Sequence, residues 1–347
     1  KGNIHVHTSL GGHSTGGFDE LIAAANSNGL DFVVMTEHYS ENYDTAALTL
    51  NGVFGKTLFV GGNEIDTADS DRFFMLPGGR DAAGFRFEHT DNVLSKIHSE
   101  KGFAMIAYPE KFRSWGSAFD GIEVFNLKTM AKSANPVTLI LDALWSGYSY
   151  PDLMFADHLK RPDANLKQFD EIAATRRISM FGGTDGHSNI GLHVFGTDTG
   201  GKLLNIKIDP YETTFRIVRM HILLPKDVPL TRESLIEAIG KGSYFTGFDA
   251  FGDSTGFRFV AADGTETVRQ GSEVPFSGGL SLRAASPVPA RMVFYKNGEK
   301  FGEQADTAEF VVKPDGPGVY RVELYQDALG DTASKMPWIV SNPIYVR

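Results

Sequence analysis

The 347-residue chain contains no cysteine. A disulfide framework, a thiolate metal site and a cysteine nucleophile are therefore excluded, and any metal ligand must be histidine, aspartate or glutamate. The chain also lacks an apolar run close to the roughly 18 residues that a membrane-spanning helix needs, so we expect no membrane span. It begins with Lys1 instead of methionine, which is typical of a processed product. Together with the missing cysteines, this start favours a periplasmic or secreted location.

Positive charge is also scarce. Lysine and arginine number 33 against 43 aspartates and glutamates, which gives a formal net charge of -10. Binding to duplex nucleic acid depends mainly on cations that neutralise phosphates, so the composition argues against such a partner. Hydrophobic residues make up 41% of the chain, which is enough for an ordinary globular core.

The first part of the chain alternates between strand-like and helix-like segments. Residues 18–28 have apolar side chains at helical spacing and end before Gly29, and residues 30–36 form an apolar run of strand length. After the short apolar start of the chain, this order predicts a parallel β-α-β unit. The pattern recurs, with strands predicted at 57–61, 103–108, 121–126 and 177–182 and helices at 91–100, 166–175 and 232–240.

The pattern changes near residue 252, where short segments of alternating hydrophobicity begin. Asn297-Gly298 between residues 291–296 and 299–302 is a strong hairpin signal. Strands predicted at 307–312, 318–326 and 338–346 complete a spacing that is typical of a β-sandwich. A chain of this length is expected to form two domains, and we place them at 1–251 and 252–347.

Candidate metal ligands follow the predicted strands. In an extended strand residues i and i+2 point to the same side, so His5 and His7 are predicted to present two imidazoles to one face. Other candidates lie at further strand ends, where ligands gather in parallel sheets. These are His13, His38, Glu64, Asp185 and His187. Imidazole suits zinc, iron and manganese, so the set predicts a hydrolytic metal site.

These motifs resemble those of the polymerase and histidinol phosphatase (PHP) superfamily. The similar segments are H-V-H-T at 5–8, His13, T-E-H at 36–38, G-N-E at 62–64 and G-T-D-G-H at 183–187. The resemblance covers about residues 1–250 and implies an α/β fold, a distorted (β/α)7 barrel that binds up to three divalent metals and hydrolyses phosphoesters. The first eight residues and P-W-I-V-S-N-P-I-Y-V at 337–346 are similar to the CehA/McbA-like branch. That likeness implies a small all-β, immunoglobulin-like sandwich after the barrel.

The resemblance also implies which residues bind metal. The ligands of one metal match His5, His7, Glu64 and Asp185, and those of another match His13, His38 and His187. Tyr108 stands where the family usually has the histidine of His-Pro, and Arg72 begins the segment where a further histidine is expected. We therefore expect one or two divalent ions, zinc, manganese or iron, and not three. Glu37 replaces the more usual aspartate and could still orient a neighbouring imidazole.

The expected activity is that of a metal-dependent phosphoesterase. A divalent cation lowers the pKa of bound water from about 16 towards roughly 7, and the metal-bound hydroxide would attack a small phosphorylated substrate. Asp185 is expected in the catalytic centre. His193, close after the G-T-D-G-H turn, is the candidate acid for the leaving group.

Substrate contacts are predicted at two strand ends. Lys111 and Arg113 follow Y-P-E and could contact a phosphate, Arg113 with bidentate geometry, although both also fit solvated loop charges. Glu123 and Asn126 belong to G-I-E-V-F-N, which resembles a further family signature. With Tyr108, they are expected to line the pocket.

Two other functions remain open. The same ligands would support a carbamate, ester or amide hydrolase, and cations that bind a phosphate dianion would distinguish the two activities. A non-catalytic, metal-binding protein of the cell envelope is the third possibility, motivated by Tyr108 and the appended sandwich. Retention of ligands for two metals argues against it.

Overall fold

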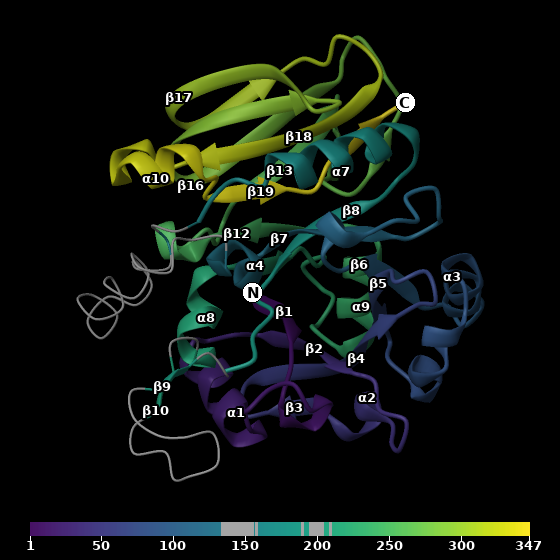
Figure 1. Ribbon diagram of the computed structural model, residues 1–347. Helices are drawn as coiled ribbons and strands as arrows, with labels where there is room; N and C mark the ends of the chain where they lie inside the picture. The colour runs from purple at the N-terminus through teal and green to yellow at the C-terminus, as the bar shows by residue number, and fades with distance from the viewer. Residues whose placement is uncertain (133–155, 157–158, 189–190, 194–204, 208–209) are drawn as a thin grey trace.

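The computed structural model describes residues 1–132, 156, 159–188, 191–193, 205–207 and 210–347 (Figure 1). Its strands are β1 (Gly2–Val6), β2 (Phe32–His38), β3 (Gly52–Phe54), β4 (Thr57–Asp66), β5 (Arg72–Leu76), β6 (Phe103–Ile106), β7 (Gly121–Asn126), β8 (Ser179–Gly183), β9 (Gly191–His193), β10 (Asn205–Lys207), β11 (Arg219–Ile222), β12 (Tyr244–Gly247), β13 (Arg258–Asp263), β14 (Glu266–Arg269), β15 (Glu273–Val274), β16 (Ser281–Lys296), β17 (Glu299–Val312), β18 (Gly318–Tyr325), β19 (Ile339–Ser341) and β20 (Ile344–Val346).

Its α-helices are α1 (Phe18–Ser27), α2 (Thr45–Leu48), α3 (Thr90–Ser99), α4 (Leu127–Lys132), α7 (Asp163–Thr175), α8 (Tyr211–Ile217), α9 (Arg232–Gly240) and α10 (Asp331–Lys335). Short 3-10 helices are η1 (Ser9–Gly11), η2 (Arg80–Ala83), η3 (Phe85–Phe87), η4 (Pro109–Lys111), η5 (Asp249–Phe251) and η6 (Asp327–Leu329).

The chain opens with the parallel β-α-β unit that the sequence predicts. Helix α1 has Asp19 and Glu20 in its first turn, where negative charge is favourable, and it buries Leu21 against the sheet. Strands β1 and β2 then pair in parallel. Strand β2 also pairs in parallel with β4, with His38 opposite Glu64. This register brings two predicted ligands to the same edge of the sheet.

The predicted (β/α)7 barrel followed by a separate immunoglobulin-like sandwich is wrong. In the described residues, 18 strands are joined by hydrogen bonds into one mixed sheet. Strand β5 lies between β4 and β6 and is antiparallel to both. Its direction follows from its connection to β4, because residues 67–71 form a tight turn and a parallel crossover needs a dozen or more residues.

The C-terminal strands belong to the same hydrogen-bonded sheet. Strand β12 pairs with β19, with Phe245 opposite Ser341, and β19 pairs with β18. Figure 1 shows these later strands at the top of the molecule and β1–β4 at the bottom, with β12 in between. The domain boundary near residue 252 remains a prediction.

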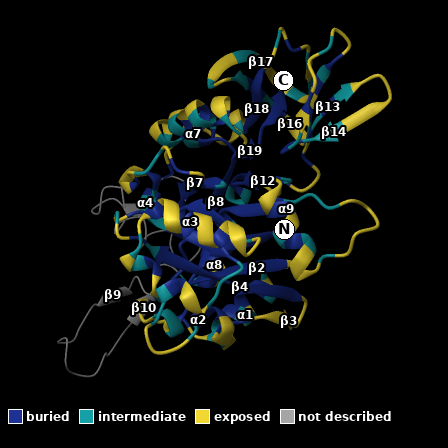
Figure 2. Cartoon of the chain, turned by 90° about the vertical axis from the view of Figure 1, so that its right-hand side faces the viewer, coloured by how far each residue is buried: buried dark blue, intermediate teal, exposed yellow. Residues whose placement is uncertain are grey.

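A buried apolar cluster connects the strands that carry the candidate site. Ile4, Val34, Val60, Phe74 and Phe181 are all buried and belong to one cluster. Figure 2 shows β2, β4 and β8 in dark blue, whereas α3 exposes one side to solvent. Strands covered on both faces read as continuous apolar runs, which explains the pattern of residues 32–35.

Across the described ranges, no helix combines the length and the apolar character that crossing a membrane requires.

Candidate metal centre

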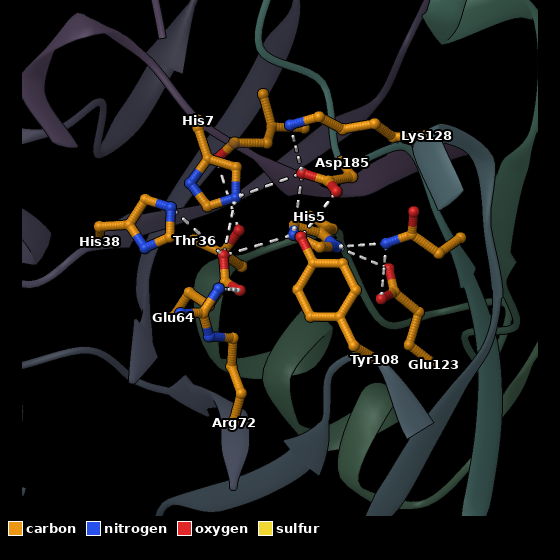
Figure 3. Close-up of polar contacts among 12 residues, drawn as sticks. His5, His7, Thr36, His38, Glu64, Arg72, Tyr108, Glu123, Lys128 and Asp185 are labelled. Atoms are coloured by element: carbon orange, nitrogen blue, oxygen red, sulfur yellow. Dashed lines mark hydrogen bonds and ion pairs between the residues drawn. The ribbon is translucent and has the colours of Figure 1, made fainter. Parts of the chain in front are cut away.

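Four candidate ligands lie where strands end. His5 and His7 come from the end of β1 and the residue after it, Glu64 lies near the end of β4, and Asp185 follows β8. A parallel bridge between Val6 and Gly186 draws the segment after β8 against the end of β1. Figure 3 shows these side chains pointing toward one another.

The carboxylate oxygens lie among the imidazole nitrogens. Glu64 Oε2 is 3.5 Å from His5 Nε2, 3.0 Å from His7 Nε2 and 3.7 Å from His38 Nε2. Asp185 Oδ1 is 3.4 Å from His5 Nε2 and 3.9 Å from His7 Nε2. The structure thus brings together the four residues that match one metal of the resemblance.

The backbone of the site departs from regular strand geometry. His5 has φ +67° and Asp185 has φ +48°, in the left-handed region that costs a non-glycine residue about 1–3 kcal/mol. The register of β1 against β2 shifts between Ile4 and Val6, as at a β-bulge, and a bulge redirects a side chain. The rings of His5 and His7 do lie 5.1 Å apart between centroids. A bulged strand, and not the predicted extended one, presents them.

His5, His7, Glu64 and Asp185 form a polar cluster, and several of its buried polar atoms have no hydrogen-bond partner among the described residues. They are His5 Nε2, both ring nitrogens of His7, Glu64 Oε2 and Asp185 Oδ1. Each such atom costs roughly 1–3 kcal/mol if it stays unsatisfied. Imidazole nitrogen and carboxylate oxygen are common ligands of divalent transition metals, so the donor set fits such an ion.

Among the residues that the structure describes, two groups of three have ligand atoms within 4.8 Å of one another. One is His5, His7 and Glu64, and the other is His7, His38 and His187. His7 belongs to both, and His13 to neither. His13 is exposed on the loop after η1, with its ring 4.7 Å from that of His38.

The electrostatics favour neutral imidazoles at His7 and His38 and ionised carboxylates at Glu64 and Asp185. Burial lowers the pKa of His7 to about 3 and that of His38 to about 4. Burial opposes ionisation of Glu64 and Asp185, but the neighbouring imidazoles outweigh it and lower both pKa values. Neutral imidazole and ionised carboxylate are the protonation states that bind metal.

The pKa of His5 shifts in the opposite direction from those of His7 and His38. Burial alone would lower its pKa, but the carboxylates of Glu123 and Asp185 raise it well above its ordinary value. Glu123 Oε1 lies 2.6 Å from His5 Nδ1, and Asn126 Nδ2 donates to Glu123 Oε2 at 2.9 Å. Glu123 and Asn126 are therefore buried behind His5, not on the pocket wall where the sequence predicts them. A carboxylate behind a ligating histidine fixes the ring orientation and increases its basicity.

A pocket of about 500 Å³ lies beside the cluster. Its walls are formed by His13, His38, Tyr39, Asp66, Arg72, Tyr108, Lys128 and His187. Lys128 Nζ lies 3.6 Å from Asp185 Oδ1 and 3.0 Å from His187 Nδ1. Sequence reasoning missed Lys128, although it follows the end of β7 and the strand-end argument could have found it.

Two of the positions that depart from the PHP pattern contact the cluster directly. Tyr108 donates its hydroxyl to Asp185 Oδ2 at 2.7 Å, and Arg72 donates to Glu64 Oε1 at 3.2 Å. Arg72 also forms two hydrogen bonds with Asp66, at 2.6 and 3.0 Å. In the expected place of two imidazoles the chain thus has a hydroxyl and a fixed cation.

Other predicted residues lie further out. Lys111 lines a second pocket beside the first, and Arg113 is exposed, with its backbone N–H donating to Asp71 Oδ1 at 2.7 Å. His193 pairs through its backbone with Asn205, and its side chain lies outside the described residues.

The carboxylate of Glu37 accepts hydrogen bonds from loop residues. Its donors are the backbone and hydroxyl of Thr8, at 3.0 and 2.6 Å, and the hydroxyl of Thr49, at 3.0 Å. The structure therefore places Glu37 beneath the loop after β1, where it anchors that loop.

Comparisons with known proteins add little. No family model matches the chain, and no curated protein matches it. The crystal structure of PsfC from Pseudomonas syringae PB-5123 is similar over 67% of this chain and 86% of that one, with 14% identity and a TM-score of 0.38. At these values the likeness defines neither a fold family nor a function, and the PHP resemblance remains a prediction.

Proposed function

We propose that the chain is a metal-dependent hydrolase that acts on a small phosphoester. The observation that carries this proposal is the set of buried, unpartnered donor atoms on His5, His7, Glu64 and Asp185. Such atoms are costly unless a ligand satisfies them, and their chemistry suits one or two zinc, manganese or iron ions. A protein that bound nothing here would gain by replacing them with apolar residues.

The surrounding residues would hold the site in a fixed geometry. When bound, a divalent cation would supply a water of lowered pKa and neutralise charge on the substrate oxygens. Arg72 engages Glu64 Oε1 and Tyr108 engages Asp185 Oδ2, which leaves Glu64 Oε2 and Asp185 Oδ1 directed into the cluster. Glu123 fixes the ring of His5 from behind.

Cations in the pocket favour a phosphoester over a carbamate, ester or amide. Arg72 and Lys128 both line it, and the side chain of Arg72 is 36% exposed. The nitrogens of Arg72 are engaged by Asp66 and Glu64, so Lys128 is the cation that can contact a phosphate dianion, whereas a neutral carbonyl substrate needs no such partner. A volume of about 500 Å³ suits a small molecule. His193 stays the candidate acid for the leaving group.

The proposal is tested by reloading chelated protein with zinc, manganese or iron and comparing 4-nitrophenyl phosphate with 4-nitrophenyl acetate. We expect metal-dependent release from the phosphate, competitive inhibition by inorganic phosphate, and loss of turnover in His7→Ala with an unchanged circular dichroism spectrum. His89→Ala is the matched control, because His89 is 78% exposed and lies outside the pocket. Near-normal turnover by metal-loaded His7→Ala would refute the proposal. Metal-dependent hydrolysis of the acetate alone would favour the carbonyl hydrolase instead.

A further inference from the structure

A second pocket, of about 310 Å³, adjoins the pocket over the metal centre. Asp66, Arg72 and Tyr108 belong to the walls of both. The other walls of the second pocket are Thr67, Ser70, Ala107, Lys111 and Phe112. A molecule whose reacting group lies over the metal centre can therefore extend past Tyr108 into this space.

The second pocket carries one positive charge that its own residues do not offset. Arg72 is bound by Asp66 through two hydrogen bonds, so these two charges balance. The Nζ atom of Lys111 lies 5.3 Å from the ring centroid of Tyr108. Within the described parts of the chain, no carboxylate forms an ion pair with Lys111. A small pocket with an uncompensated ammonium group attracts an anion.

The backbone just before the short helix that contains Lys111 has an unusual conformation. Tyr108 has φ +52° and ψ +64°, a left-handed conformation that is costly for a residue with a side chain. This turn ends the segment after β6 and leads directly into η4, whose last residue is Lys111. Strain of this kind, next to a candidate active site, is typical of a functional constraint.

We propose that the second pocket binds a carboxylate group of the same substrate whose scissile phosphate lies over the metal centre. Lys111 then determines specificity, because it contributes the charge that recognises this group, and Tyr108 separates the two anionic sites. The inference rests on the proposed function and adds the substrate class, a phosphoester that also carries a carboxylate group.

The test uses the metal-loaded full chain and phosphonates, which contain no ester bond to hydrolyse. Dissociation constants of phosphonoacetate, 3-phosphonopropionate and 4-phosphonobutyrate are compared with those of ethyl-, propyl- and butylphosphonate by calorimetry. At one or more of these lengths, we expect the carboxylate to strengthen binding by about fivefold, as for a single accessible ion pair. Lys111→Ala should abolish this gain and Lys111→Glu should reverse it, while the alkylphosphonates keep their affinity. Lys56→Ala is the control, since Lys56 is exposed on the β3–β4 turn.

Two results would overturn the inference. If alkylphosphonates bind but a carboxylate adds nothing at any length, or if the gain survives in Lys111→Glu, the second pocket does not recognise a carboxylate and the proposed function stands. If the metal-loaded protein binds none of the phosphonates, the proposed function fails, and the inference fails with it.

Discussion

Glu123→Gln should weaken metal binding by about 10- to 100-fold, which corresponds to about 1.4–2.7 kcal/mol. Glu123 is fully buried, and its Oε1 lies 2.6 Å from His5 Nδ1. Glutamine keeps the volume of the side chain and an acceptor oxygen at that position, but it removes the negative charge. The ring of His5 would keep its place and lose basicity at Nε2, the nitrogen that faces Glu64 and Asp185.

The affinity is measured by competition with a chromophoric chelator, with circular dichroism as the check on folding. Glu171→Gln is the matched control, because Glu171 is an exposed carboxylate on α7 whose ion-pair partner is Lys167. We expect the control to bind metal as the wild type does. A folded Glu123→Gln protein with unchanged metal affinity would show that the carboxylate behind His5 has no part in metal binding.

Two further predictions concern the buried residue Glu323 and the close contact between Gly183 and Glu123. Glu323 is buried between two arginines that hold its pKa at about 2 although burial would raise it, so Glu323→Gln should destabilise the protein by about 3–5 kcal/mol in urea unfolding at pH 7. Because the pKa of Glu323 is depressed, this stabilisation is present above about pH 4.5 and is lost as the pH falls towards 2. A difference in unfolding free energy between wild type and variant that does not shrink over this pH range would contradict the proposed role of the Glu323 charge. A Cβ at Gly183 would lie 2.0 Å from Glu123 Oε1, so Gly183→Ala should lower metal affinity by about tenfold or more. Gly186→Ala should leave metal affinity unchanged, because its Cβ would have no neighbour nearer than 3.4 Å. Equal losses of affinity in the two variants, measured by chelator titration, would show that the contact between Gly183 and Glu123 does not matter for metal binding.

The parts of the fold that the sequence predicts are those with local signals. Helix α1 and strand β2 follow from a helical repeat, the stop at Gly29 and an apolar run, all within one short stretch. The predicted fold class is wrong because the fold depends on pairings between distant strands, and such pairings produce no local pattern in the sequence. Strand β5 enters the sheet in the antiparallel direction, and Phe245 pairs with Ser341, nearly a hundred residues later in the chain.

The candidate site shows the same division. Strand ends pointed to His5, His7, Glu64 and Asp185, and the structure places these four side chains together. The bulge at His5 could not be predicted, because a left-handed histidine is set by its tertiary surroundings and has no sequence signature. The sequence shows that Arg72 begins the segment where a histidine is expected. It does not show the hydrogen bonds of Arg72 to Asp66 and Glu64, because these depend on the antiparallel direction of β5.

The central claim, that these side chains bind a divalent metal, is tested most directly by metal analysis. Wild-type protein and His7→Ala are each equilibrated with zinc, manganese or iron, freed of unbound ion and analysed by inductively coupled plasma mass spectrometry. His7 belongs to both groups of ligand atoms, so we predict one or two bound ions per chain in the wild type and a loss from both groups in the variant. A wild-type chain that retains no metal, or a folded His7→Ala chain that retains as much as the wild type, would contradict the account.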